Sequence, residues 1–164
     1  MSLVRARHTT QAMKSLRLAT LVGCGALAIL CLPRPALAIC TITATNVNFG
    51  NYDVFSATAL DTTSTITYRC GTESNISVML NTGSSGTFNP RTMRKTGEVL
   101  NYNLYRNAAR TNIWGDGTGG STYYTRANPP NNTNVVLTVY ARVPALQDVS
   151  GGTYTDTITA TINF

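Results

Sequence analysis

The sequence predicts an all-β domain of the sandwich type, and three observations support this. Short segments in which apolar and polar residues alternate recur along the chain, separated by turns rich in Gly, Asn and Pro. No window has the hydrophobic period of a helix. Residues 39–164 contain 24 threonines, mostly at polar positions of the alternating segments, where a β-branched residue suits a solvated sheet face. We therefore expect seven to eight antiparallel strands and no second domain.

Six stretches carry this alternation. In each of them every second residue is apolar, as in a strand with one buried face. Asn46 follows the first stretch where the pattern shifts by one residue, which predicts a bulge or a bend. Pro144 ends the fifth, because proline supplies no ladder donor. The six alternating stretches are residues 40–45, 65–70, 76–80, 98–105, 135–143 and 158–164. Residues 91–94 are expected to be a further strand, which forms a hairpin with residues 98–105 around Lys95-Thr96-Gly97.

The last strand is the clearest. From Ile158 to Phe164 apolar residues strictly alternate with Thr or Asn up to the end of the sequence. These apolar side chains lose their burial if the segment detaches, so it is expected to be part of the core. Asp156 has the same parity as Ile158 and is expected to be a hydrogen-bonded residue at the start of the strand.

Residues 1–38 have the features of a secretory signal peptide. Residues 1–17 carry four Lys or Arg and no acid, Leu18–Leu32 is uncharged, and Ala36-Leu37-Ala38 fits a small-residue cleavage site. The uncharged run of 15 residues is shorter than the roughly 20 needed to span a bilayer. We predict cleavage after Ala38, export without stable membrane insertion, and a single mature domain of residues 39–164.

The basic character of the chain lies mostly in this N-terminal segment. The whole chain has 13 Lys and Arg, seven Asp and Glu, and a formal charge of +6. Five of the basic residues precede residue 39, so the expected mature chain has eight against seven acids and a net charge of +1. Nucleic-acid binding needs a basic face, so the overall charge gives no support for a nucleic-acid partner.

Cys40 and Cys70 are the two cysteines that remain after cleavage. They have one intramolecular pairing, and the oxidising compartment reached by export favours a disulfide. Closing a loop of about 30 residues stabilises a domain by roughly 3–4 kcal/mol in the chain-entropy model. A reactive thiol or a metal pair is less favoured, because no further Cys or His follows.

The expected mature chain is poor in catalytic side chains. His8, the only histidine, lies in the predicted signal peptide, so Ser-His, Cys-His and His-metal sites are excluded. Asp116 lies in a glycine-rich stretch, but one carboxylate is too few for a calcium site. We expect no enzyme activity, no metal and no cofactor. The remaining acids lie in or beside turns, where caps and solvated charges are usual: Asp53, Asp61, Glu73, Glu98, Asp116, Asp148 and Asp156.

Trp114, Tyr123 and Tyr124 are candidates for an aromatic surface patch that binds a sugar or a surface. Core packing or loop anchoring is the simpler interpretation of the same residues. Basic residues cluster around the central hairpin, where a solvated face is expected and a partner-binding face is the alternative. These are Arg91, Arg94, Lys95, Arg106 and Arg110.

Several stretches together resemble the spore coat protein U domain family, which includes subunits of archaic (Csu-type) chaperone-usher pili. The resemblance covers essentially all of residues 40–164. Its most specific parts are the central Tyr-x-Leu-Tyr-Arg-x-Ala-Arg-Thr-Asn run and the Gly-x-Tyr-x-Asp-Thr ending. The stretches that carry it are Cys40; Asn48-Phe49-Gly50-Asn51-Tyr52-Asp53; Cys70; residues 100–112; and residues 152–157 with Asn163-Phe164.

The resemblance implies an immunoglobulin-like sandwich that lacks one strand and so leaves an apolar groove open. A periplasmic chaperone fills the groove first. In the fibre, which an outer-membrane usher assembles, the N-terminal extension of a neighbouring pilus subunit replaces the chaperone. The family thus implies export through the periplasm to the cell surface or an extracellular fibre, and a role in adhesion or biofilm formation. The expected strand-accepting edge consists of Thr157, Ile158, Thr159, Ala160, Thr161, Ile162, Asn163 and Phe164.

The start of the expected mature chain departs from this pattern. Only Ile39 precedes Cys40 after the predicted cleavage, so the chain accepts a strand but has almost nothing to donate. Three interpretations remain: a subunit at the end of a fibre, a secreted coat-type protein that assembles otherwise, or an earlier cleavage that preserves a donor segment. The competing function is a stand-alone coat or matrix protein that self-assembles after export. A carbohydrate-active enzyme is disfavoured by the missing histidine.

Overall fold

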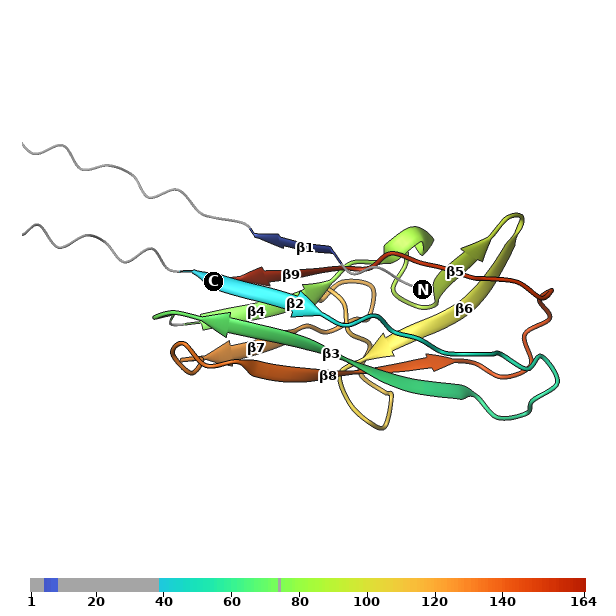
Figure 1. Cartoon of the computed structure of the whole chain (residues 1–164), viewed down its shortest axis with the longest axis horizontal. Helices are drawn as coiled ribbons and strands as arrows, with labels where there is room; N and C mark the ends of the chain where they lie inside the picture. Colours follow the sequence, from blue (N-terminus) through green and yellow to red (C-terminus); the bar gives the residue numbers. More distant parts are fainter. Residues whose placement is uncertain (1–4, 9–38, 74) are drawn as a thin grey trace, which may run out of the picture.

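The structure is a computed structural model, and it describes residues 5–8, 39–73 and 75–164. Two β-sheets pack face to face (Figure 1). The larger sheet has five strands in the order β2-β3-β8-β6-β5. Their bounds are Cys40–Ala44 for β2, Leu60–Cys70 for β3, Val135–Val143 for β8, Glu98–Tyr105 for β6 and Arg91–Lys95 for β5.

The smaller sheet has four strands in the order β1-β9-β4-β7. They span Arg5–His8 (β1), Thr159–Asn163 (β9), Asn75–Leu80 (β4) and Tyr124–Ala127 (β7), and a short 3₁₀ helix, η1, covers Gly83–Ser85. The eight strands found within residues 39–164 pair antiparallel. The fold is therefore all-β and consistent with an immunoglobulin-like sandwich, as predicted.

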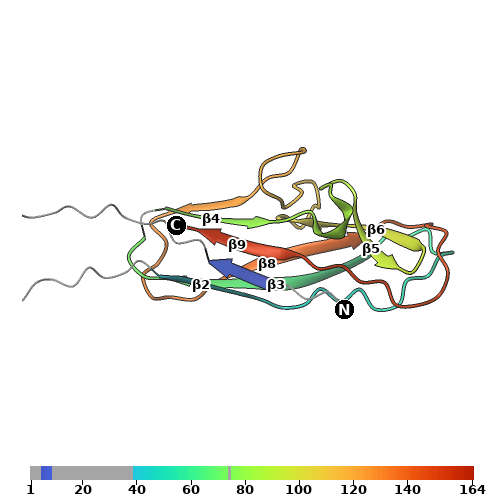
Figure 2. The ribbon, with the colours of Figure 1, turned by 90° about the horizontal axis from the view of Figure 1, so that it is seen from above.

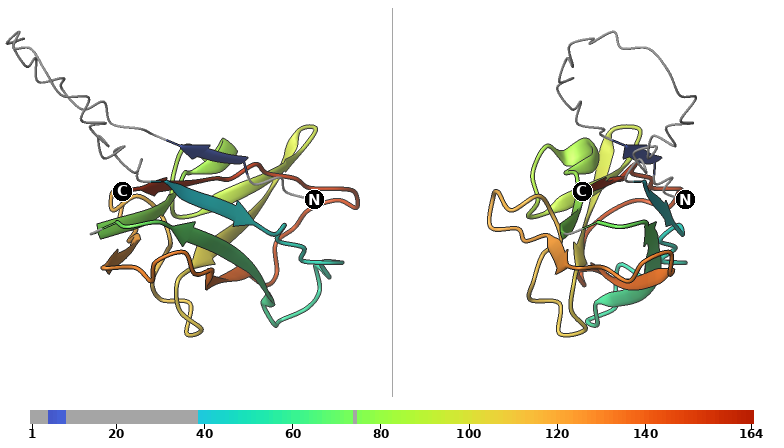
Figure 3. Two further views of the ribbon diagram at one scale, coloured as in Figure 1. Left: turned by 60° about the vertical axis from the view of Figure 1, so that its left-hand side comes forward. Right: turned by 90° about the vertical axis from the view of Figure 1, so that its left-hand side faces the viewer.

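The core residues come from the inner faces of the two sheets, which the end-on view in Figure 3 shows facing each other. Alternate residues of the core-forming strands point into this core, as in β6, where Leu100, Tyr102 and Leu104 are buried. Val78 of β4 and Val143 of β8 are fully buried from the opposite faces. Burial of one such apolar side chain contributes about 1.5–3 kcal/mol. Threonines occupy most outward positions of β2 and β3, as the pattern predicts.

The Cys40–Cys70 disulfide joins β2 to β3. These two residues are register partners in the antiparallel pair, with their Cα atoms 4.1 Å apart. Both are buried. The predicted disulfide is thus confirmed, and it fixes the outer strand of the larger sheet to its neighbour at the end where β2 begins.

The main differences from the expected strands concern β3, β7 and β1. β3 begins at Leu60, five residues before the expected Thr65, because Leu60 pairs with Val143 of the long strand β8. β7 has no buried residue and so no apolar alternation. β1 lies inside the predicted signal peptide, most of which (residues 9–38) is outside the described residues. In the described part of the chain, no helix is long and apolar enough to cross a bilayer.

Candidate functional site

The candidate site begins at the edge of β9. Ile158, Ala160 and Ile162 are buried, which confirms the alternation read from the sequence. One edge of β9 pairs antiparallel with β4, from Leu80↔Ala160 to Ser77↔Asn163. Thr157 and Ile158, which the sequence assigned to the same strand, precede β9 as an extension without ladder pairing in the described chain.

The other edge of β9 carries an added strand. β1 pairs with it in parallel, from Arg5↔Thr159 to His8↔Ile162. β1 also contacts β2, the edge strand of the larger sheet. Figure 2 shows β1 in the slot between β9 and β2. Within the described part of residues 39–164, β4 is the sole ladder partner of β9, so this slot is where a further strand joins the sandwich.

An apolar cavity of about 620 Å³ continues the line of this slot past Ile158. Its floor comes from β5, β6 and β8, through Met93, Leu100, Tyr102, Leu104 and Val143. Two segments outside the strands form its walls: residues 47–55, which follow β2, and residues 149–154, which lead toward β9. We call the β9–β2 slot and this cavity together the groove. It is lined mostly by apolar side chains, and β1 pairs with the edge of β9 that borders it.

The wall of residues 47–55 is held by Tyr52. Its hydroxyl donates to Pro144 O at 2.8 Å and accepts from Gln147 N at 2.8 Å. The Gln147 side chain in turn extends the sheet, because its amide oxygen accepts from Asn101 N at 2.8 Å and its amide nitrogen donates to Asn101 O at 2.9 Å. Phe49 of the same wall packs edge-on against Tyr102, with ring centroids 6.0 Å apart.

Asp156 fixes the approach to β9. Its carboxylate is buried and accepts hydrogen bonds from Ser84 N at 2.9 Å, Ser84 Oγ at 2.8 Å and Tyr102 Oη at 2.6 Å. Burial, with this bond, raises the pKa of Tyr102. The approach of Asp156 to η1 leaves no room for a side chain at Gly83, whose added Cβ would lie 2.2 Å from Asp156 Oδ2. The expected role as a hydrogen-bonded residue before the strand is confirmed.

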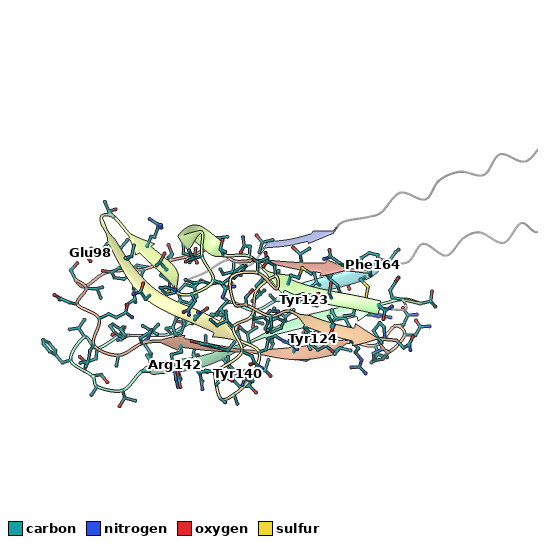
Figure 4. The ribbon with its side chains drawn as sticks, turned by 180° about the vertical axis from the view of Figure 1, so that it is seen from behind. Glu98, Tyr123, Tyr124, Tyr140, Arg142 and Phe164 are labelled. Carbon is teal, nitrogen blue, oxygen red and sulfur yellow. A yellow bond between two sulfur atoms is a disulfide. The ribbon has the colours of Figure 1, made fainter. Side chains whose placement is uncertain are left out.

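The aromatic candidates do not form one patch. Trp114 is buried, and its indole N–H donates to Val78 O at 3.0 Å, so the prediction that it belongs to a surface patch is wrong. Tyr123 is exposed, whereas Tyr124 is half-buried with its hydroxyl 3.4 Å from that of Tyr68. Figure 4 shows the labelled Tyr123 and Tyr124 far along the molecule from Glu98. Trp114 therefore stabilises the core, as the simpler interpretation holds.

The basic residues around the hairpin have different environments. Arg91 is fully buried, so the expectation of a solvated face is wrong for it. Its guanidinium donates to Asn81 O, to Trp114 O at 2.6 Å and to Asn103 Oδ1 at 2.9 Å. Alternation along β5 explains this, because Arg91 has the inward parity of Met93 while Arg94 points outward.

The carboxylates are separate rather than clustered. Asp61 binds Arg142 through two bonds of 2.7 and 2.8 Å, and these bonds lower its pKa. Asp53 and Asp116 accept backbone N–H groups two residues ahead, as turn residues do. Among the residues that the structure describes, no three Asp, Glu, Cys or His side chains gather as a metal site would require.

The chain belongs to the spore coat protein U domain family, whose model matches residues 28–161. Its members are structural coat and pilus subunits. A relative in Myxococcus xanthus, Protein U, is 33% identical over 131 residues, which cover 72% of this chain and 71% of the relative.

A solved structure has the same fold. It is the chaperone–tip adhesion subunit pre-assembly complex CsuC–CsuE from the archaic chaperone-usher Csu pili of Acinetobacter baumannii. The match has a TM-score of 0.57 and 26% identity, and it covers 78% of this chain and 40% of the matched chain. The chain thus spans less than half the length of that relative. It is similar to a subunit of a Csu chaperone-usher pilus.

The sequence predicted the strand β9 but not the residues that form the cavity. The cavity walls, residues 47–55 and 149–154, come from parts of the chain that have no regular alternation. The one available indication was the Asn48–Asp53 stretch, which entered only through its resemblance to the family. Val47, just before this stretch, and Phe49 within it are half-buried and separated by one exposed residue, but the next half-buried residue, Tyr52, lies three positions on, so the alternation stops.

Proposed function

We propose that this chain is an exported, non-catalytic structural subunit of a surface assembly that is completed by a strand from another molecule. The observation that carries the proposal is the groove, in which an added strand pairs with β9 beside an apolar cavity of about 620 Å³. An unpaired apolar edge promotes aggregation, so a partner strand is needed once this edge is free. A strand that buries about five side chains contributes on the order of 10 kcal/mol.

The strand that occupies β9 in the full chain is β1, within the predicted signal peptide. Removal of residues 1–38 would take β1 away and leave the edge of β9 open in the exported protein. The predicted cleavage therefore links export to strand acceptance. The edge Thr157–Phe164 is the proposed site of strand exchange, and the Cys40–Cys70 disulfide holds β2 on the other side of the slot.

A chaperone-usher pilus is the assembly that the comparisons favour. The similar Csu subunit was solved as a pre-assembly complex with a chaperone. By analogy, the partners proposed here are a periplasmic chaperone, an outer-membrane usher and neighbouring pilus subunits, and the role of the fibre is adhesion or biofilm formation. Only Ile39 lies between the predicted cleavage site and Cys40, which favours a position at the end of a fibre.

The second candidate is a coat or matrix protein that self-assembles after export. The similarity to Protein U favours it, because the match covers 71% of that relative, whereas the match to the Csu structure covers 40% of the matched chain. Genes for a chaperone and an outer-membrane usher beside the gene for this chain would favour the pilus. Their absence would favour the coat.

The test is to express the full chain for export, with and without a periplasmic chaperone of the archaic chaperone-usher class. We expect the chaperone to raise the soluble periplasmic yield severalfold and to co-purify with the chain. A chain that is equally soluble, monomeric and folded without any partner would contradict strand acceptance. The mass of the purified protein locates the cleavage site, and a retained segment before Cys40 would identify a donor strand.

A further inference from the structure

The wall of residues 150–154 is held by the tip of the β5–β6 hairpin. Lys95 Nζ donates to Ser150 Oγ and to Gly151 O, both at 2.6 Å. It also lies 5.7 Å from the centre of the Tyr154 ring. The lysine therefore reaches from the end of β5 across the groove wall and contacts it at three points.

Glu98 binds the same wall from the start of β6. One carboxylate oxygen, Oε2, accepts hydrogen bonds from Ser150 N at 3.1 Å, Ser150 Oγ at 2.8 Å and the Tyr154 hydroxyl. Lys95 Nζ is 3.8 Å from this oxygen. The bond from Tyr154, with those from Ser150, lowers the pKa of Glu98 to about 2. We call Lys95, Glu98, Ser150 and Tyr154 the latch.

Gly152 is needed for this contact. A Cβ atom there would lie 2.9 Å from Cδ and from Cε of Lys95, so the aliphatic part of the lysine lies directly against the glycine. The backbone of Gly152 also has a φ of +146°, which side chains other than glycine rarely adopt. The lysine and the glycine thus fit each other, which ties the latch to the backbone course of the wall.

Backbone pairing does not hold the wall. Along the segment of residues 150–155, the first residue with a backbone–backbone hydrogen bond is Thr155, which exchanges bonds of 2.7 and 3.0 Å with Arg94. Residues 150–154 precede that pair and make none. Their position therefore depends on the side chains of Lys95 and Glu98.

From these contacts we infer that Lys95 and Glu98 are positioning residues that hold one wall of the groove in the form that receives a strand. The inference rests on the proposed function. A wall that is ordered before binding has less conformational entropy to lose when a strand enters. The latch contacts the cavity end of the groove rather than the β9 edge, so it affects the half of the incoming strand that lies in the cavity.

The test compares Glu98→Gln and Lys95→Met with Asp61→Asn. Lys95→Met keeps the aliphatic stem and removes the charge and the donors. Asp61→Asn is the matched control, because it weakens an ion pair with Arg142 that lies on the outer face of β3 and β8 and does not line the cavity. Each full-length chain is expressed for export, purified with its disulfide intact, unfolded and refolded with a fluorescent peptide.

The probe is a peptide of about ten residues in which Val and Thr alternate. Two further peptides carry Ser in place of Val in one half or the other, which makes the result independent of strand direction. We expect Glu98→Gln and Lys95→Met to weaken binding of the all-Val probe about tenfold. The affinity of Asp61→Asn for this probe should stay near that of wild type. One of the two half-Ser probes places serine in the cavity. The latch variants should bind this probe with the same affinity as wild type does, because its serine half gains little from the cavity.

Hydrogen exchange gives a second readout. The amide of Ser150, which donates to Glu98 Oε2, should exchange faster in both latch variants than in wild type or Asp61→Asn. Binding and exchange equal to those of the control would overturn the role of the latch and leave the proposed function intact. A wild-type chain that binds no probe would overturn the proposed function, and the latch role with it.

Discussion

The hydroxyl of Tyr102 donates a hydrogen bond of 2.6 Å to Asp156 Oδ2. Tyr102 belongs to the floor of the cavity, and Asp156 lies two residues before the buried Ile158. One contact therefore joins the larger sheet to the segment that enters β9. The floor of the groove and the β9 strand at its edge are coupled through this pair, so a change at either residue is expected to affect both.

Tyr102→Phe is expected to destabilise the domain by about 2 kcal/mol, because a buried carboxylate loses one of its donors. Urea unfolding measures the effect. Tyr140→Phe is the control, since Tyr140 lies on the outer side of β8 between buried neighbours Val139 and Ala141. Equal midpoints for Tyr102→Phe and the wild type would show that the Tyr102–Asp156 bond contributes nothing to stability.

The disulfide gives a second prediction. Replacing Cys40 and Cys70 by Ser removes a cross-link with a sequence separation of 30 residues, which is expected to cost roughly 3–4 kcal/mol. Guanidinium unfolding of the double variant should match that of the reduced wild type. A midpoint as high as that of the oxidised wild type would contradict the prediction.

The strands were predictable where burial of one face makes apolar and polar residues alternate in the sequence. β9 and β8 are of this kind, since Ile158, Ala160 and Ile162 are buried and Val139, Ala141 and Val143 repeat the pattern. β7 was not predictable, because its residues are all exposed or half-buried and its pairing with β4 comes from the backbone alone. Arg91 has the same parity as the apolar Met93, which indicates an inward side chain. Its charge, however, favours a solvated position, and so the sequence led to the wrong expectation.

The cavity could not be predicted, because its walls meet only in the folded chain. Residues 47–55 and 149–154 are about a hundred residues apart in the sequence. Tyr52 connects the first segment to the residues just before the second through its hydrogen bonds with Pro144 and Gln147. Nothing near Trp114 in the sequence indicates that its indole reaches Val78 of another strand. Sequence periodicity reports which side of a strand is buried, and it is silent about which loops close over that side.

Glu98 makes stability depend on acidity in a specific direction. Hydrogen bonds from Tyr154 and Ser150 lower its pKa from 4.5 to about 2 in the folded chain. A group whose pKa is lower in the folded state stabilises it above the unfolded pKa, and the effect is lost as the pH falls toward the folded pKa. The difference in unfolding midpoint between wild type and Glu98→Gln should therefore be constant above about pH 5 and shrink toward pH 2.

Urea midpoints taken across this range test the prediction. Asp61→Asn provides a comparison, because the pKa of Asp61 is also lowered, through its bonds to Arg142. In the double variant the two pH-dependent effects should add, since the two sites share no partner. A wild-type-minus-Glu98→Gln difference that stays constant down to pH 2 would mean that Glu98 titrates as an ordinary surface carboxylate.

Replacement of Arg91, even by lysine, is expected to destabilise the fold. Its guanidinium satisfies Asn81 O, Trp114 O and Asn103 Oδ1 from a fully buried position, and burial lowers its pKa to about 10. Lysine lacks the planar fork that reaches these acceptors together, so Arg91→Lys should cost about 3 kcal/mol. Arg94→Lys, on the exposed side of the same strand, should stay within about 0.5 kcal/mol of wild type. Urea unfolding of the two variants decides the matter, and equal small losses would mean that the buried guanidinium contacts contribute little to the fold.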